Sequence, residues 1–274
     1  MGSVRRTSVA GTWYPDNPAR LVSQLDGYLE RARIEDPDGR LRAIVAPHAG
    51  LMYSGPVAAY AYNVARRHQH SALVLIGPSH FVSFAGVSIW PDGQWETPLG
   101  PVAVHGELAA ALRSETRQIV ELPAAHGREH SLEMQMPFIA HVLPDVPIVP
   151  MVMGHQTRET AFALGAALAE AVAAHAPDAL LVASSDLSHY EDATTAAALD
   201  HQVIEHVERL DPEGLMQAIE REPRHACGGG PMVAVLDAAR RLGATHSRLL
   251  EYADSGDVSG DKSSVVGYMA AAIW

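Results

Sequence analysis

The sequence predicts a single α/β domain over residues 1–274, with a mostly parallel central sheet flanked by helices. Three observations predict it. Short apolar runs rich in Val, Ile and Leu recur along the chain, longer segments with helical spacing of apolar residues separate them, and no stretch has the composition of a linker. Strands that alternate with helices imply right-handed crossovers and a sheet covered on both faces.

The expected strands are apolar throughout, as strands buried on both faces are. In chain order they are Ala43–Ala46, Leu73–Ile76, Ile148–Met153, Leu180–Ala183 and Val265–Ile273. The expected helices are Pro18–Arg33, Gly55–Arg67, Leu132–His141, Thr160–Ala174, Ala193–Arg209 and Pro231–Leu242. The segment Ser83–Val104 is rich in Trp, Pro and Gly, and it predicts a hairpin outside this alternation, which would be a candidate lid.

Composition argues against several classes of function. Hydrophobic residues make up 47% of the chain and charged residues 19%, so a sizeable core is available. The net charge of -12 argues against nucleic-acid partners and against an anionic membrane surface. Residues 1–14 lack the apolar stretch of a signal peptide, and no apolar run approaches the roughly 18 residues of a membrane span. With one cysteine there is no internal disulfide, so we expect a cytoplasmic protein.

Histidines follow three of the expected strands, at the point where each strand ends. His48 comes after Ala43–Ala46, His80 after Leu73–Ile76, and His189 after Leu180–Ala183. Because ligands of an open parallel sheet bind beyond the carboxyl ends of its strands, we expect these imidazoles to share one site.

Cys227 lies in a glycine-rich stretch directly before an expected helix. Glycines there let the backbone approach a ligand closely, and a helix N-terminus favours thiolate over thiol. Two imidazoles and a thiolate suit iron, copper or zinc with one coordination position open. Two other interpretations stay open: a cysteine nucleophile with a histidine base, and a buried small apolar residue.

The segment 126–133 holds two further histidines at an expected helix start. Ser131 is placed to cap that helix and Glu133 to lie in its first turn, but neither explains His130. The His126–His130 spacing is similar to a zinc helix pair, yet Gly127 stands where a metalloprotease needs Glu. The Ser and His near Asp186 lack the Gly-x-Ser-x-Gly elbow of a hydrolase.

Short motifs that span nearly the whole chain carry a family resemblance. They are Arg6–Pro15, Pro47–Gly50, Tyr53–Pro56, Gly77–His80, Thr97–Gly100, Glu129–Glu133, Ser184–Tyr190, Ala226–Gly228, Tyr252–Asp257 and Val266–Tyr268. In this order they resemble the Memo family, to which the AmmeMemoRadiSam system protein B belongs. The resemblance implies the fold of the class III extradiol ring-cleaving dioxygenases.

The resemblance also implies a set of site residues. His48 and His80 match the two histidine ligands of the dioxygenase iron, and Cys227 falls where the dioxygenases place a carboxylate ligand. His189 matches their acid/base histidine, His130 matches a histidine that contacts substrate, and Asp186 would belong to the same pocket. A thiolate in place of a carboxylate changes metal preference, so ring cleavage does not follow from the fold.

The implied function is that of a metal-binding protein, and two versions remain open. The first is an iron- or copper-dependent oxidoreductase with a dioxygenase-like site, in which iron(II) is expected ahead of copper or zinc. The second is a non-catalytic protein that binds a metal and a phosphotyrosine-type peptide. A cysteine-dependent hydrolase is a third hypothesis. Bacterial relatives imply a radical-SAM pathway partner, and neither nucleic acid nor membrane is expected.

Overall fold

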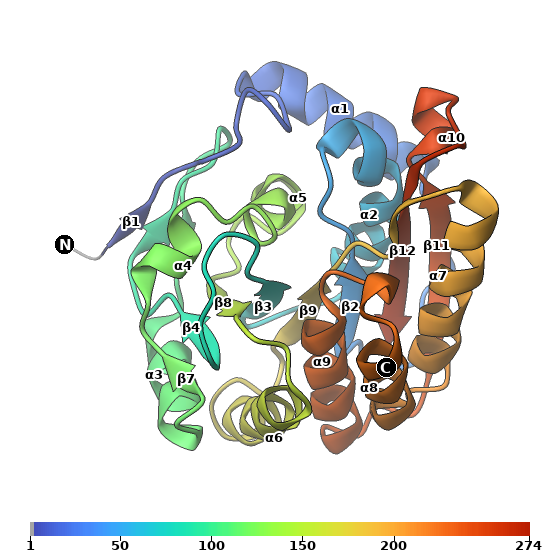
Figure 1. Cartoon of the computed structure of the whole chain (residues 1–274). Helices are drawn as coiled ribbons and strands as arrows, with labels where there is room; N and C mark the ends of the chain where they lie inside the picture. The colour runs from blue at the N-terminus through green and yellow to red at the C-terminus, as the bar shows by residue number, and fades with distance from the viewer. Residues whose placement is uncertain (1–2) are drawn as a thin grey trace.

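In the computed structural model, which describes residues 3–274, four parallel strands form the centre of a nine-stranded sheet (Figure 1). Across the sheet they are β2 (Ala43–Ala46), β9 (Leu180–Ser184), β3 (Leu73–Pro78) and β8 (Ile148–Met153). Every residue of these four strands is buried. Continuous apolar runs were therefore a reliable signal for the centre of the sheet.

Strands on both sides of this centre run antiparallel, so the sheet as a whole is mixed. β12 (Val265–Ile273) pairs antiparallel with β2, and both β10 (His189–Glu191) and β11 (Ser247–Asp254) pair antiparallel with β12. On the other side β4 (Val87–Ile89) lies antiparallel to β8, and β7 (Ile119–Val120) pairs with β4. An apolar run predicts a buried strand but not its direction. The sequence therefore did not show that the strands beside the parallel centre, β12 and β4, run antiparallel to it.

Helices cover both faces of the sheet (Figure 1). On one face lie α1 (Pro18–Arg31), α2 (Leu51–Ala65) and α5 (Met136–Val142). On the other face lie α3 (Gly106–Glu115), α6 (Arg158–His175), α7 (Ala193–Glu208), α8 (Pro212–Arg221) and α9 (Gly229–Arg241). Successive residues of β2 serve the two cores in turn: Val45 joins the core that contains α6 and α9, and Ile44 joins the core that contains α1 and α2.

The remaining helical elements are short: α4 (Pro123–Gly127), the 3₁₀ turns η1 (Glu133–Gln135) and η2 (Pro223–His225), and α10 (Gly256–Ser259). No helix within residues 3–274 is both long and apolar enough to span a membrane. The α/β architecture with helices on both faces, expected from the alternation of strands and helices, is confirmed.

The segment Ser83–Val104 is only partly a hairpin. Its first strand, β4, belongs to the main sheet. Its later strands, β5 (Gln94–Trp95) and β6 (Val102–Ala103), form an antiparallel pair that β1 (Val4–Arg5) extends. Trp95 is 1% exposed and anchors the segment in the core, which argues against a lid.

The start of α2 differs from the sequence prediction in a way that matters for the site. The helix begins at Leu51, four residues before the expected Gly55, and Pro56 lies inside it. Pro is favoured in the first turn of a helix, but Pro56 lies in the second turn of α2. The chain instead turns directly after His48, so the loop that carries this histidine is short and is held at both ends by regular structure.

Candidate metal centre

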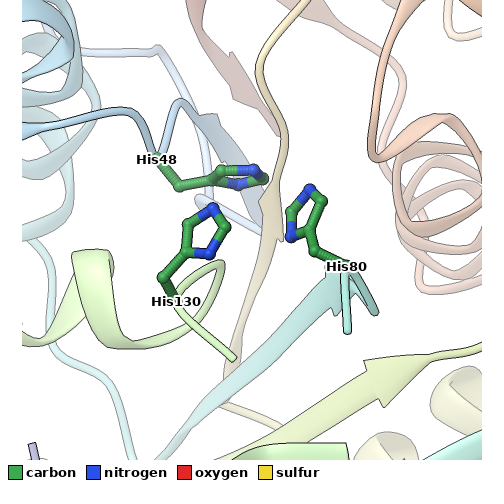
Figure 2. A group of neighbouring side chains, drawn as sticks. All are labelled: His48, His80 and His130. Atoms are coloured by element: carbon green, nitrogen blue, oxygen red, sulfur yellow. The ribbon is translucent and has the colours of Figure 1, made fainter. Parts of the chain in front are cut away.

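Three histidines come together beyond the carboxyl ends of the parallel strands. His48 follows β2, His80 follows β3, and His130 lies in the loop between α4 and η1. One ring nitrogen of each lies within 4.8 Å of one ring nitrogen of each of the others. Figure 2 shows the three rings grouped together, each carried by a different segment of the chain. This is the one group of its kind found among residues 3–274.

His48 is buried and uncharged. Burial, and after it the charge of His80, lowers the pKa of His48 to about 3. Its Nδ1 lies 2.9 Å from the Oγ of Ser184, the last residue of β9, and its Nε2 lies 3.3 Å from the Sγ of Cys227. His48 is therefore in the neutral form that metals bind.

His80 is held by the carboxylate of Glu129. Oε1 of Glu129 lies 2.8 Å from His80 Nδ1, and Oε2 accepts the backbone N–H of His80 at 2.6 Å. Burial alone would raise the pKa of Glu129, but the hydrogen bonds and charge of His80 outweigh it and lower this pKa to about 2. A carboxylate on one nitrogen of a histidine is a common way to orient the other nitrogen toward a metal.

His130 lies beside His80, with ring centroids 4.5 Å apart and ring planes 15° from parallel. Its side chain is 12% exposed. Burial, then the charges of His48 and His80, lowers the pKa of His130 to about 4. Because η1 begins only at Glu133, His130 does not sit in a helix at all. The His130 imidazole lies in one group with His48 and His80.

Cys227 lies against His48 but stands outside the group of three histidines. On one tetrahedral ion, a histidine nitrogen about 2.0–2.1 Å from the ion and a thiolate sulfur about 2.3 Å from it lie about 3.5–3.6 Å apart. The 3.3 Å between Cys227 Sγ and His48 Nε2 is slightly shorter than that separation, so a small shift would let both atoms bind one ion. Burial, and after it the charge of Asp186, raises the pKa of the Cys227 thiol, although Cys227 directly precedes α9 and its cap Gly228. The free thiol is thus favoured over a free thiolate nucleophile.

Asp186 ties the loop after β9 to the loop after β2. Its Oδ1 accepts the backbone N–H groups of His48 at 2.7 Å and of Ala49 at 3.2 Å, and its carbonyl oxygen accepts the backbone N–H of Cys227 at 3.3 Å. Burial raises the pKa of Asp186, against those hydrogen bonds. One residue of this loop therefore sets the backbone positions of both His48 and Cys227.

His189 belongs to the same loop and begins β10. Its Nδ1 donates to the carbonyl oxygen of Leu187 at 2.8 Å, which leaves Nε2 as the ring nitrogen that can take up a proton. The charge of His189 contributes to the pKa shifts of both His48 and Asp186. The three strand-end histidines expected to share one site, His48, His80 and His189, thus follow the carboxyl ends of β2, β3 and β9, and Asp186 lies in the same loop as His189.

Aromatic side chains surround the histidines. Trp13 lies 4.4 Å from His130 between ring centroids and is 39% exposed. Phe81 lies 5.8 Å from His130 and is 50% exposed, and Tyr190 lies 5.7 Å from His189 and is 78% exposed. Tyr190 also has a backbone φ of 63°, which is a strained conformation for a bulky side chain. These three residues are called the aromatic rim below.

Comparison with protein families gives a match that includes these residues. A family model described as Memo-like protein matches residues 5–272, which include the whole of the centre. This chain belongs to the Memo family.

Relatives in the Memo family match the chain from end to end. A MEMO1 family protein of Methanothermobacter thermautotrophicus is 41% identical, over 97% of this chain and 98% of that protein. A MEMO1 family protein of Thermotoga petrophila is 39% identical, over 98% of this chain and 99% of its own. Among solved structures, an uncharacterized protein of Escherichia coli K12 covers 84% of this chain and 99% of its own, with a TM-score of 0.56 and 15% identity. That structure shows a shared fold and nothing more.

Within the Memo motif around His130, the capping role predicted for Ser131 is wrong, whereas Glu133 does lie in the first turn of η1. The Ser131 hydroxyl donates to the carbonyl oxygen of Pro78 at 2.9 Å rather than capping a helix. Glu133 forms an ion pair with Arg5 and accepts the Tyr14 hydroxyl at 2.9 Å, so it fastens the N-terminal segment that carries Trp13. Long-range partners of this kind leave no local sequence signal.

The zinc-pair interpretation of His126 and His130 also fails. His126 lies in α4, is fully buried, and its Nε2 meets Ser88 Oγ at 3.0 Å, outside the group that contains His130. Sequence reasoning missed two residues that do touch the centre, Glu129 and Ser184. A buried carboxylate next to His130 in a family motif was the available hint for Glu129, and no hint distinguished Ser184 from its neighbours.

Proposed function

We propose that this Memo family chain binds one transition-metal ion through His48, His80 and Cys227 and uses it in oxidoreductase chemistry. Iron(II) is the first choice of metal, with copper and zinc as the alternatives that two imidazoles and a thiolate also suit. The observation that carries the proposal is the convergence of two strand-end histidines, each engaged through Nδ1, with a thiol 3.3 Å from the Nε2 of His48.

We choose Cys227 rather than His130 as the third ligand because of the hydrogen bonds that orient the histidine rings. His48 and His80 each have a hydrogen-bond partner on Nδ1, as metal ligands usually do. Within residues 3–274 no hydrogen bond orients the His130 ring, whose Nδ1 lies 3.7 Å from Glu129 Oε1. An unfastened imidazole at the mouth of the centre is suited to meet a substrate oxygen, and we assign His130 that role.

The other residues around the proposed metal site have different roles. A bound iron or copper ion supplies redox chemistry and polarises a ligand oxygen. His189 offers Nε2 to a substrate proton, because Nδ1 is engaged with Leu187. Asp186 fixes the backbone that carries His48 and Cys227, and the family resemblance adds it to the catalytic set with His189 and His130.

A second candidate function is favoured by the aromatic rim. Exposed Trp13, Phe81 and Tyr190 offer stacking faces beside the histidines, which suits a planar or aromatic ligand such as a phosphotyrosine-type peptide side chain. In this version the metal centre binds without turnover. The cytoplasmic setting and a radical-SAM pathway partner remain part of the proposal on the family resemblance alone.

Metal analysis and an oxygen assay separate these functions. The chain is purified without added metal, its metal content is measured, and the protein is then titrated anaerobically with iron(II), copper and zinc. Oxygen consumption by the loaded protein with a panel of catechols supports the oxidoreductase. Metal binding with ligand affinity but no oxygen consumption supports the binding protein. Wild-type protein that takes up no metal contradicts both.

A further inference from the structure

The Ser184 hydroxyl is the centre of a buried hydrogen-bond network that ends on His48. Its Oγ lies 2.6 Å from the carbonyl oxygen of Ser131, 2.7 Å from Gln135 Nε2 and 2.9 Å from His48 Nδ1. These partners come from the loop before η1, from η1 itself and from the loop after β2. One hydroxyl thus joins three segments that meet at the centre.

The orientation of the Gln135 side-chain amide is fixed by its other partners. Its Nε2 lies 3.1 Å from the carbonyl oxygen of Pro47, which can only accept, so the amide nitrogen must be the atom placed there. Its Oε1 lies 2.8 Å from the hydroxyl of Tyr62, which donates. Gln135 therefore donates one side-chain N–H to the Pro47 carbonyl oxygen and the other to Ser184 Oγ.

The single proton of Ser184 must point to Ser131. The Ser131 carbonyl oxygen cannot donate, and two oxygens 2.6 Å apart with no proton between them would repel each other. Since Gln135 also donates to Ser184, the hydroxyl has one acceptor position left for His48. The ring nitrogen that fills it has to be an N–H donor.

We propose that Ser184 is a positioning residue that holds His48 as the Nδ1–H tautomer, with the lone pair of Nε2 directed toward Cys227 and the metal. The metal part rests on the proposed function, but the tautomer is a property of the protein without metal. His80 matches the pattern, because the Glu129 carboxylate can only accept from His80 Nδ1. Both proposed histidine ligands are thus set to bind through Nε2 before a metal arrives.

The chain contains a natural counter-example in His126. The Ser88 hydroxyl, 3.0 Å from His126 Nε2, has the Leu122 carbonyl oxygen as an acceptor at 3.1 Å. With the Ser88 proton on that carbonyl oxygen, Nε2 of His126 carries a proton, the opposite tautomer to that of His48. Both serines are fully buried, so Ser88 gives a matched control away from the centre.

The test is a two-bond ¹⁵N–¹H correlation spectrum of the imidazole rings in the full chain without metal at pH 7.5. Signals of His48 are assigned by their loss in His48→Gln, and those of His126 by their loss in His126→Gln. We expect His48 protonated at Nδ1 and His126 protonated at Nε2. In Ser184→Ala the Nε2–H form of His48 should gain population, and Zn²⁺ affinity should fall about 10- to 100-fold.

Two further variants separate positioning from general damage. Ser184→Thr keeps the hydroxyl and should restore the wild-type tautomer and Zn²⁺ affinity. Ser88→Ala also removes a buried serine hydroxyl, and it should leave both unchanged. A wild-type spectrum with His48 protonated at Nε2 overturns the proposal, as does Ser184→Ala protein with unchanged tautomer and affinity. Wild-type protein that binds neither Zn²⁺ nor iron(II) nor copper refutes the proposed metal site instead, while the spectrum still decides the tautomer.

Discussion

Glu129 holds His80 at two points, with Oε2 on the backbone N–H at 2.6 Å and Oε1 on the ring Nδ1 at 2.8 Å. Oε1 also accepts the backbone N–H groups of His130 and Ser131, each at 2.9 Å. One buried carboxylate therefore sets both the backbone and the ring of a proposed ligand, and the loop that brings His130 beside it.

Replacing Glu129 by Gln should weaken metal binding without removing a ligand. The amide puts a donor where a backbone N–H or the ring N–H of His80 needs an acceptor, so His80 loses its orientation. We expect metal affinity to fall about 10- to 100-fold, measured by competition with a chromophoric chelator. Glu133→Gln is the control, since Glu133 is equally buried but binds Arg5 and Tyr14. It should lower stability and spare the affinity; equal affinities in all three proteins would contradict this role of Glu129.

His189→Ala should keep the metal and lose proton transfer. The ring is fastened through Leu187 and is absent from the group of three histidines, so its removal leaves the proposed ligands in place. We expect near-normal metal content with altered redox or substrate chemistry. Metal content is measured by elemental analysis beside oxygen consumption. Loss of metal as complete as in His48→Ala would make His189 a ligand.

His130→Asn should reduce affinity for the ligand rather than for the metal. A lost hydrogen bond to a charged or polarised oxygen is worth roughly 1.5–3 kcal/mol, or about a 10- to 150-fold weaker Kd. Binding of a catechol and of a phosphotyrosine-like ligand to the loaded proteins can be measured by calorimetry. Unchanged Kd values for both ligands would remove His130 from the substrate-contacting set.

His126 should make the stability of the metal-free protein depend on pH. Burial, then the charge of Arg5, lowers the pKa of His126 to about 3, from an ordinary value of about 6.5. Between these values the unfolded chain binds a proton that the folded chain does not. The contribution of the neutral His126 to the free energy of unfolding is therefore fully present above about pH 6.5, and it is lost progressively as the pH falls toward 3.

His126→Gln removes that contribution and should flatten the profile. Between pH 6.5 and 5.0 the free energy of unfolding of wild-type protein should fall by about 1.6 kcal/mol more than that of the variant. Urea denaturation of both metal-free proteins at the two pH values measures the difference. Parallel profiles would show that His126 is protonated in the folded state.

The strands and helices that were predicted correctly are those with a clear local pattern of apolar residues. Ala43–Ala46, Ile148–Met153 and Val265–Ile273 were predicted with the bounds that the structure has, because a continuous apolar run can only be buried. The helix α8 was missed because its short apolar stripe, Leu215, Met216 and Ile219, lies in a mostly polar segment.

The residues of the site also differ in whether local sequence was enough to assign them. His48 and His80 could be placed together from strand ends alone, since parallel strands deliver their following residues to one edge. Cys227 was a candidate ligand from its glycine-rich stretch before an expected helix, while Asp186 and His130 needed the family resemblance to be assigned. Glu129 and Ser184 could not be assigned, because their partners lie 49 and 136 residues away along the chain and only the fold brings them together.

The central claim is that one metal ion is held by His48, His80 and Cys227, although His130 is the third member of the histidine group. It is tested most directly by the metal content per chain of wild-type, Cys227→Ser and His130→Asn proteins after identical anaerobic loading with iron(II) and desalting, with folding verified by circular dichroism. We expect one ion per chain in the wild type and in His130→Asn, and loss of most of the metal in Cys227→Ser. Full occupancy in Cys227→Ser together with loss of metal in His130→Asn would contradict the account and make the third ligand an imidazole.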